Sequence, residues 1–220
     1  MGQPITNAIA VAGIHTGIGK TVVSAVLAEA LGTDYWKPIQ AGTDDRDMLT
    51  VQRLITNGAD RVHPEAVLLQ MPASPHTAAA AEGIEIDHTA FSWPVTDKPL
   101  LVETAGGVLS PVSAMHTVAD MIAYYELPTV LVSQNYLGSI NHTLMTVETL
   151  RNRGIRIIGI IISGEKNDMS EQFIAQYTRM PILAHIPAIG IMDNANIISI
   201  ARNISDDLAV IKNTLSVSKQ

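Results

Sequence analysis

The chain has 220 residues and a net charge of −7, and 47% of its residues are hydrophobic whereas 16% are charged. This length favours one α/β domain over two, so we expect residues 1–220 to form a single domain. The negative charge argues against nucleic acid as the main partner, and the lack of cysteine excludes disulfides and thiolate metal sites. No apolar run approaches the roughly 20 residues of a membrane span, and no secretory signal is recognisable, so we expect a cytoplasmic protein without a membrane partner.

A glycine-rich segment, residues 13–21, lies between the first predicted strand and the first predicted helix. Residues 8–12 are uniformly apolar, as in a buried strand, and residues 22–31 are amphipathic, as in a helix. Backbone N–H groups at the start of such a helix bind anions. Lys20 adds positive charge for the outer phosphates of a nucleotide, and Thr21 adds a hydroxyl for a magnesium ion. The predicted nucleotide-binding residues of this phosphate loop are Gly13, His15, Thr16, Gly17, Ile18, Gly19, Lys20 and Thr21.

Predicted strands and helices alternate along the remaining sequence. We expect strands at 35–38, 99–102, 128–132, 155–162 and 181–186, and helices from Asp47, at 74–83, at 139–153 and at 196–215. Residues 40–47 and 103–107 are predicted loops. The apolar side of the helix from Asp47 is assigned to Leu49, Val51, Leu54 and Ile55, and the strand at 155–162, the richest in β-branched residues, is expected to be central. The alternation predicts an α/β fold with a doubly wound, mainly parallel sheet, and the phosphate loop gives it P-loop NTPase topology.

Charged side chains follow two of the predicted strands. Lys37 ends one of them and Glu103 follows another, and ligands of parallel sheets bind at such carboxyl ends. A carboxylate at the end of a buried strand is costly unless it serves a site, which favours a functional role for Glu103. Lys37 is either a solvated lysine or a ligand of an anionic intermediate, and Asp47 is either a helix N-cap or a metal ligand. With Thr21, the two carboxylates form a candidate Mg²⁺ site.

Six short blocks between residues 13 and 142 resemble the dethiobiotin synthetase family and occur in the family's order. The blocks are Gly-Ile-His-Thr-Gly-Ile-Gly-Lys-Thr at 13–21, Lys37-Pro38 with Ala41-Gly42, Asp47, Ser74-Pro75-His76, Val102-Glu103-Thr104-Ala105-Gly106-Gly107, and Leu137-Gly138-Ser139-Ile140-Asn141-His142. The resemblance implies an ATP-dependent ligase of biotin synthesis that carboxylates 7,8-diaminononanoate with CO₂. The ureido ring then closes through a carbamate and a carbamic-phosphoric anhydride, with release of ADP and phosphate.

The resemblance also implies roles for individual residues, with ATP as co-substrate and Mg²⁺ as cofactor. Catalytic roles fall to Lys20, Lys37 and Thr16, and metal binding falls to Thr21, Asp47 and Glu103. Family members are homodimers, in which the substrate tail reaches the neighbouring subunit. The implied substrate-binding residues are Thr16, Lys37, Ala41, Gly106, Gly107, Val108, Leu137, Gly138, Ser139, Ile140 and Asn141. Taken alone, the pair Gly106-Gly107 is equally consistent with an ordinary turn.

Base recognition is expected near the ends of the last two strands. The nucleotide-binding residues assigned there are Ser163, Gly164, Pro187 and Ala188. Family members that select adenine carry an asparagine where this chain has Ser163, which offers a single short hydroxyl. We therefore expect weak discrimination among bases, with GTP or CTP supporting turnover within about tenfold of ATP.

Two other functions stay open from the sequence. A partition or positioning switch ATPase has a similar fold but carries a second lysine near the start of the phosphate loop, where this chain reads Gly13-Ile14-His15. An amidating synthetase of cobalamin synthesis is the nearer alternative, and it would lack the diamine site. Turnover of ATP that depends on diaminononanoate and bicarbonate separates the three functions.

Overall fold

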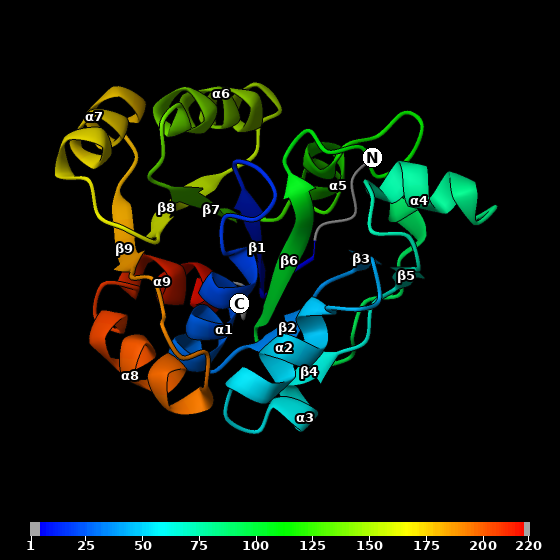
Figure 1. The fold of residues 1–220 in the computed structure, drawn as a ribbon, viewed down its shortest axis with the longest axis horizontal. Coiled ribbons are helices and arrows are strands. Elements are labelled where there is room, and N and C mark those ends of the chain that lie inside the picture. Colours follow the sequence, from blue (N-terminus) through cyan, green and yellow to red (C-terminus); the bar gives the residue numbers. More distant parts are fainter. Residues whose placement is uncertain (1–4, 218–220) are drawn as a thin grey trace.

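The structure, a computed structural model, describes residues 5–217. Its main sheet has parallel strands in the order β4-β2-β6-β1-β7-β8-β9, with helices on both faces (Figure 1). The strands are β1 (Ala8–Gly13), β2 (Asp34–Trp36), β4 (Val62–His63), β6 (Leu100–Gly107), β7 (Thr129–Gln134), β8 (Ile157–Ser163) and β9 (Ile182–Ile186). The predicted doubly wound parallel sheet is confirmed.

The helices divide between two hydrophobic cores, one on each face of the sheet. In β1 the side chains alternate: Ile9 and Val11 belong to one core, and the alanines between and beside them belong to the other. Helices α1, α2, α8 and α9 pack in the first core, and α4 and α5 pack in the second. The helices are α1 (Lys20–Leu31), α2 (Asp47–Leu54), α3 (Gly58–Arg61), α4 (Pro75–Ala81), α5 (Val118–Tyr124), α6 (Ser139–Asn152), α7 (Asp168–Thr178), α8 (Asn194–Ile204) and α9 (Ala209–Val217), with a 3₁₀ turn η1 (His88–Ala90).

The strand predicted to be central is β8, an interior strand that pairs with β7 on one side and with β9 on the other. Two loop predictions are wrong in detail. Residues 103–107 continue β6 instead of forming a loop, because Gly107 pairs with Gly13 beyond a register shift. Part of the predicted loop at 40–47 is a short strand, β3 (Ile39–Ala41), which pairs with β5 (Val67–Leu69) outside the main sheet.

The predicted apolar side of helix α2 is confirmed at Val51, Leu54 and Ile55, which are buried, but not at Leu49. Leu49 is 49% exposed, whereas Met48 is buried with Val51 and Leu54. The buried side chains therefore recur at three-residue intervals from Met48, which places Leu49 on the solvent side.

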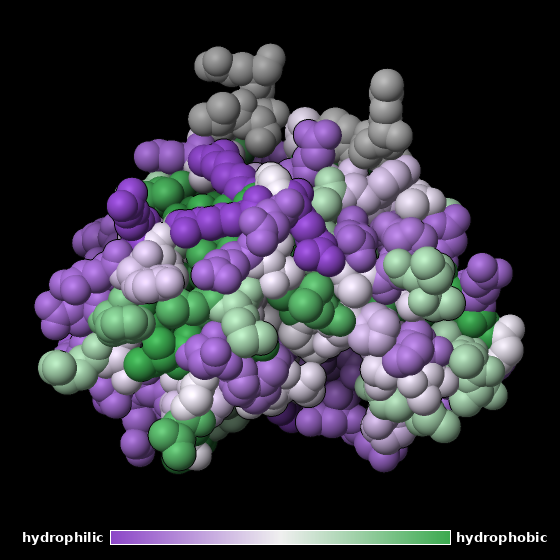
Figure 2. All heavy atoms as spheres, turned by 90° about the horizontal axis from the view of Figure 1, so that it is seen from above, coloured by the Kyte–Doolittle hydropathy of each residue, from purple (hydrophilic) through white to green (hydrophobic). Residues whose placement is uncertain are grey.

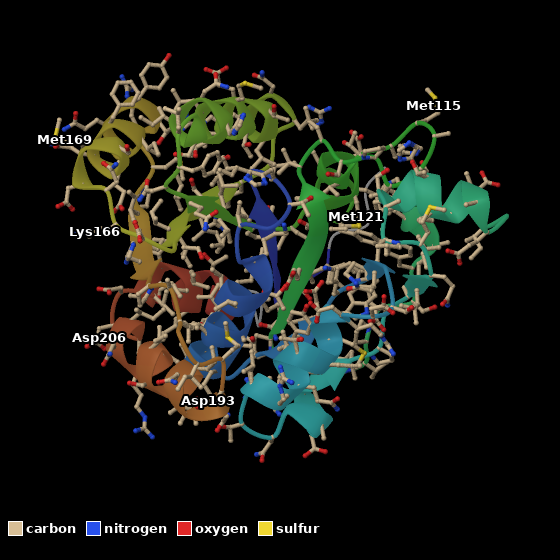
Figure 3. All side chains as sticks on the ribbon, viewed as in Figure 1. Met115, Met121, Lys166, Met169, Asp193 and Asp206 are labelled. Atoms are coloured by element: carbon tan, nitrogen blue, oxygen red, sulfur yellow. The ribbon has the colours of Figure 1, made fainter. Side chains whose placement is uncertain are left out.

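The predicted C-terminal helix is broken in two. Helix α8 ends at Ile204, and a turn containing the exposed Asp206 (Figure 3) precedes α9. The turn is closed by a hydrogen bond of 3.0 Å from the backbone N–H of Asp207 to the carbonyl of Ile204. The predicted apolar stripe still packs against the sheet, since Ile197, Ala201, Ile204, Leu208 and Ile211 are buried in the first core and Ile200 is partly buried against it.

The surface carries no sign of a membrane-spanning segment among the described residues. Within residues 5–217, no helix has both the length and the apolar character needed to cross a bilayer. On the face shown in Figure 2, hydrophobic groups lie in separate patches among hydrophilic side chains.

The packing of β8 against β9 generates a stability prediction. A Cβ atom at Gly159 would lie 2.6 Å from Leu183 Cγ, so Gly159→Ala overpacks the sheet and should lower the free energy of unfolding by about 1–3 kcal/mol. Urea unfolding measures this change. Adding Leu183→Ala should relieve the clash, so the double variant should lose less stability than the sum of the two single changes. If the two single losses of unfolding free energy simply add in the double variant, the two positions are not in tight contact.

Candidate functional site

The phosphate loop connects β1 to α1 and is anchored at both ends. The backbone N–H of Ile14 donates to the Val132 carbonyl at 3.1 Å, and the side chain of Ile18 is completely buried in the first core. Gly17 and Gly19 have φ of 78° and 82°, a left-handed conformation that favours glycine. Ile18 can therefore offer a nucleotide only its backbone, while its side chain fixes the loop to the core.

Lys20 begins α1 and turns back toward the loop. Its side chain is mostly buried and its Nζ donates to the His15 carbonyl at 3.1 Å. A Cβ atom at Gly13 would lie 2.9 Å from Lys20 Cδ, so the glycine leaves room for the lysine stem. Burial lowers the pKa of Lys20, an effect opposed by the charge of Glu103. The N-cap of α1, Gly19, provides no side-chain cap, so the first backbone N–H groups of the helix stay available beside Lys20, where the anion site is predicted.

Four predicted residues meet beneath the loop. The Thr21 hydroxyl lies 2.5 Å from Asp47 Oδ1 and 3.1 Å from Glu103 Oε1. The Lys37 ammonium forms an ion pair with Asp47, and its Nζ lies 3.7 Å from Glu103 Oε1. These four side chains, called the ionic cluster below, come from α1, the end of β2, the start of α2 and β6. The structure thus brings together residues that are up to 82 positions apart in the sequence.

For Lys37 and Asp47, this geometry excludes the purely structural alternatives that the sequence left open. Lys37 is 8% exposed, so it is not a solvated surface lysine. Burial alone would lower the pKa of Lys37, but Glu103, Asp47 and the hydrogen bonds to them outweigh it and raise the pKa, so the ammonium stays charged. The N-cap of α2 is Arg46, and the Asp47 carboxylate points into the ionic cluster instead of capping the helix.

Tyr35 supports the ionic cluster and was not predicted to do so. Its hydroxyl donates to Glu103 Oε2 at 3.0 Å. Burial, followed by the charge of Glu103, raises the pKa of Tyr35 well above its usual value, so the phenol remains a hydrogen-bond donor. Glu103 is only 1% exposed and depends on such partners, because a buried carboxylate without them is unstable. The available sequence signal was the position of Tyr35 two residues before Lys37 on the same strand.

The ionic cluster suits a hard divalent cation. Asp47, Glu103 and Thr21 present oxygen atoms to one point, and Mg²⁺ binds few protein oxygens together with phosphate oxygens and water. Among residues 5–217, no group of three or more His, Cys, Asp or Glu side chains is arranged to hold a metal alone. The donor set therefore fits Mg²⁺ bound together with a nucleotide better than a metal held by protein ligands only.

A cleft of about 350 Å³ opens beside the start of the phosphate loop. Of the predicted substrate residues, Thr16, Gly107 and Val108 line it. One wall is a face of α6 that was not predicted, formed by His142, Met145, Thr146 and Thr149. Their spacing of three, four and seven residues is the helical repeat, which was the signal available in the sequence.

The glycine pair lies against the phosphate loop and is not an isolated turn. A Cβ atom at Gly107 would lie 3.2 Å from His15 Cα, and one at Gly106 would lie 3.5 Å from Thr16 Oγ1. The N–H of Gly107 donates to Ser110 Oγ at 2.9 Å. Gly107 therefore allows close approach of the two segments, and its N–H is already engaged within the chain.

The remaining predicted substrate residues lie outside this cleft. Leu137 and Asn141 are exposed at the start of α6, whereas Ser139 is buried and its Oγ accepts from the Tyr136 N–H at 3.3 Å. Two more predicted residues are not in the lining: Lys37 lies in the ionic cluster, and Gly106 lies near Thr16. The rest are Ala41 at the end of β3, Gly138 before α6, and Ile140, which packs against the first core.

The residues assigned to the base lie on the other side of the loop. Ser163 ends β8 and faces Gly19, and Gly164 follows it. Pro187 and Ala188 follow β9 and are exposed.

A parallel sheet, a phosphate loop at its central strand and oxygen ligands beneath that loop define a P-loop nucleotide-binding protein. The family model described as an AAA domain matches residues 7–196. The chain is 47% identical to the ATP-dependent dethiobiotin synthetase BioD of Nitrobacter hamburgensis, over 84% of this chain and 88% of that protein. It is 45% identical to the ATP-dependent dethiobiotin synthetase BioD of Cytophaga hutchinsonii, over 79% of this chain and 84% of that protein. The chain belongs to the dethiobiotin synthetase family.

Solved structures share the fold at low sequence identity. A ParA family ATPase from Chlorobium tepidum matches with a TM-score of 0.53 and 12% identity, covering 97% of this chain and 99% of that one. MinD from Pyrococcus horikoshii, solved with Mg-ADP, matches with a TM-score of 0.53 and 17% identity, covering 98% of this chain and 97% of that one. These likenesses support the fold assignment and nothing further.

The ionic cluster predicts a stability change for Lys37→Met. This variant keeps an apolar stem but leaves the buried Glu103 and the partly buried Asp47 without their cation, so the free energy of unfolding should fall by about 3 kcal/mol in metal-free urea titrations. The matched control is Lys166→Met, which removes an exposed lysine paired with the exposed Asp168 and should leave the free energy of unfolding nearly unchanged. Equal losses in the two variants would contradict the buried ion pair.

Proposed function

We propose that the chain is an ATP-dependent dethiobiotin synthase, which carboxylates 7,8-diaminononanoate and closes its ureido ring. The observation that carries this proposal is 43–47% identity to proteins named ATP-dependent dethiobiotin synthetase over most of the chain. The arrangement around the phosphate loop supports it, because Thr16 of the loop lines the cleft and Thr21 of the loop belongs to the ionic cluster, so a diamine and a phosphate could meet along one loop.

The first step joins an amine of the substrate to CO₂. The amine nitrogen attacks the carbon of CO₂, a C–N bond forms, and a proton is lost to solvent, which leaves an anionic carbamate. Thr16 and the backbone near Gly107 would position the amine in the cleft. We assign Lys37 to hold the carbamate, since its pKa is raised and it stays a cation close to the loop.

The second step transfers a phosphoryl group. A carbamate oxygen attacks the γ-phosphorus of ATP, the bond to the leaving ADP oxygen breaks, and a carbamic-phosphoric anhydride forms. Lys20 would contact the β- and γ-phosphates and stabilise the charge that builds up between them. Thr21, Asp47 and Glu103 would hold Mg²⁺, which neutralises phosphate charge when it is bound.

The last step closes the ring. The second amine attacks the anhydride carbon, the C–O bond to phosphate breaks, and inorganic phosphate leaves as the nitrogen loses its proton. The sequence of steps requires positioning and positive charge and no side-chain nucleophile. This requirement agrees with a site built from lysines, a hydroxyl and backbone groups.

We further propose a cytoplasmic homodimer, in which the carboxylate tail of the diamine reaches the start of α6 in the neighbouring subunit. Leu137 and Asn141 are exposed there and do not line this chain's own cleft. The start of a 14-residue helix favours a carboxylate. Burial of Leu137 by a second subunit would also remove a large apolar side chain from solvent.

The reaction is tested by incubating the protein with ATP, magnesium, diaminononanoate and bicarbonate. Dethiobiotin identified by mass spectrometry, with one ADP released per ring, supports the proposal. A partition-type switch would hydrolyse ATP without the diamine, and an amidating synthetase would need an amide donor. The ParA and MinD likenesses do not favour the first alternative, because they rest on the fold alone.

Lys20→Ala should lower turnover by about 10²–10³-fold, because it removes a cation from the phosphoryl-transfer site. Steady-state ADP release with the diamine present measures this loss, and circular dichroism checks that the fold is intact. A variant that keeps half of the activity would overturn the assignment of Lys20.

Glu103→Gln keeps the size of the side chain and its ability to accept from Tyr35 but removes the charge. The magnesium concentration for half-maximal turnover should therefore rise, by about tenfold for the loss of one charged ligand. A magnesium titration identical to that of the wild-type protein would assign Glu103 a purely structural role.

A further inference from the structure

Three neighbouring strands end at the same level beside the phosphate loop. In the parallel register, Gln134 of β7 is opposite Ser163 of β8, and Ser163 is opposite Ile186 of β9. The three strands lie side by side (Figure 1). Their ends form a row of positions, called the strand rim below, at the carboxyl edge where ligands of parallel sheets bind.

The side chain of Ser163 is turned toward the phosphate loop. A Cβ atom at Gly19 would lie 2.6 Å from Ser163 Oγ, and Ser163 is 8% exposed. The hydroxyl therefore sits directly against the backbone of the loop. In this position it fills the space under Gly19 and is poorly placed to reach a base beyond the strand rim.

Gln134 occupies the neighbouring position with a longer side chain. It lies across Gly164, because a Cβ atom there would be 3.3 Å from Gln134 Nε2 and 3.6 Å from its Cγ. Gly164 has φ of +90° and leaves this space open. Among residues 5–217, the Gln134 carboxamide has no hydrogen-bonding partner, so one donor group and one acceptor are available at the strand rim.

The adjacent amide, Asn135, is engaged in a structural role. Its Nδ2 donates to the Glu165 carbonyl at 2.9 Å and to Glu171 Oε1 at 2.8 Å, which ties the loop after β8 to α7. Lys166 of this loop (Figure 3) pairs with Asp168 at 2.8 Å. The Asn135 Nδ2 group is thus committed to the loop after β8 and to α7, and its Oδ1 is buried without a partner. Among the described residues, the Gln134 carboxamide makes no such hydrogen bond.

The two ends of the phosphate loop face different neighbours. At its start, His15 lies against Gly107, Thr16 lies near Gly106, and both residues line the cleft. Gly19, at its end, lies against Ser163. Since the γ-phosphate must meet the carbamate in the cleft, a nucleotide lying along the loop directs its base toward the strand rim.

We propose that Gln134 is the side chain that contacts the edge of the nucleotide base, and that Ser163 supports the phosphate loop instead. The proposal deepens the proposed function and rests on its use of ATP. The carboxamide accepts from the exocyclic amino group of adenine and donates to the neighbouring ring nitrogen. Cytosine offers the same amino group beside a ring nitrogen, and since no described partner fixes which end of the amide faces the base, the amide can turn to match guanine. Weak discrimination among natural bases follows, as the sequence predicts, but the contact itself is specific.

The test combines one variant with one base analogue. Purine riboside triphosphate lacks the exocyclic amino group and so cannot make one of the two hydrogen bonds. In the wild-type protein, kcat/KM for ATP should exceed that for the analogue by about fivefold, the effect of one hydrogen bond. In Gln134→Leu the two nucleotides should be equal within about twofold, with the loss appearing in KM for ATP and kcat nearly unchanged.

Ser163→Ala is the matched control at the strand rim. It should leave the ratio of ATP to analogue unchanged, because its hydroxyl faces Gly19. If Gln134→Leu still prefers ATP over the analogue in kcat/KM, the proposal is overturned. If the preference is lost only in Ser163→Ala, Ser163 makes the contact. Calorimetric binding of both nucleotides without diamine separates the two claims. If the binding ratio depends on Gln134 while no nucleotide yields dethiobiotin, the proposed function fails and the base contact stands.

Discussion

A buried carboxylate held by an ammonium and a phenol is the constraint on which the site depends. Glu103 lies in the middle of the sheet, where a charge without partners would be strongly destabilising. Tyr35 and Lys37 come from the strand beside it, Thr21 from the helix after the phosphate loop, and Asp47 from the next helix. Satisfying one charge therefore fixes the relative positions of four separate segments.

This arrangement lets the same residues stabilise the fold and serve the proposed chemistry. Oxygen atoms that converge on one hydroxyl are also the ligands that a magnesium ion prefers. An ammonium between the carboxylates keeps their mutual repulsion low when no metal is present. The site is thus preorganised by ion pairing, with positive charge close to the position where an anionic intermediate would form.

Much of the fold was predictable because its signals are local. Alternating apolar strands and amphipathic helices predict a parallel sheet, and the segment from 13 to 21 predicts the phosphate loop. The convergence of Thr21, Asp47 and Glu103 could also be predicted, since carboxyl ends of parallel strands share one edge. The break at Asp206 was missed because the apolar stripe continues across it without a change of period.

Features that depend on contacts between distant segments were harder to predict. In the sequence, nothing distinguishes Tyr35 from other buried strand residues, because its contact with Glu103 joins two distant segments. The face of α6 in the cleft carries mostly polar side chains at helical spacing. The sequence shows this spacing but not which segment packs opposite that face. The orientation of Ser163 toward Gly19 likewise follows from how β8 and the loop pack. Sequence spacing locates a strand end, and packing decides where its side chain points.

The buried side chain of Ile18 has a consequence for the thermodynamics of nucleotide binding. Many loops lose backbone freedom when a ligand arrives, and that loss weakens binding. Here an isoleucine in the middle of the loop is already packed in the core, and the loop start is bonded to β7. Association then requires little ordering of the loop, so its entropy should come mainly from released water and ions, and its heat-capacity change should be small.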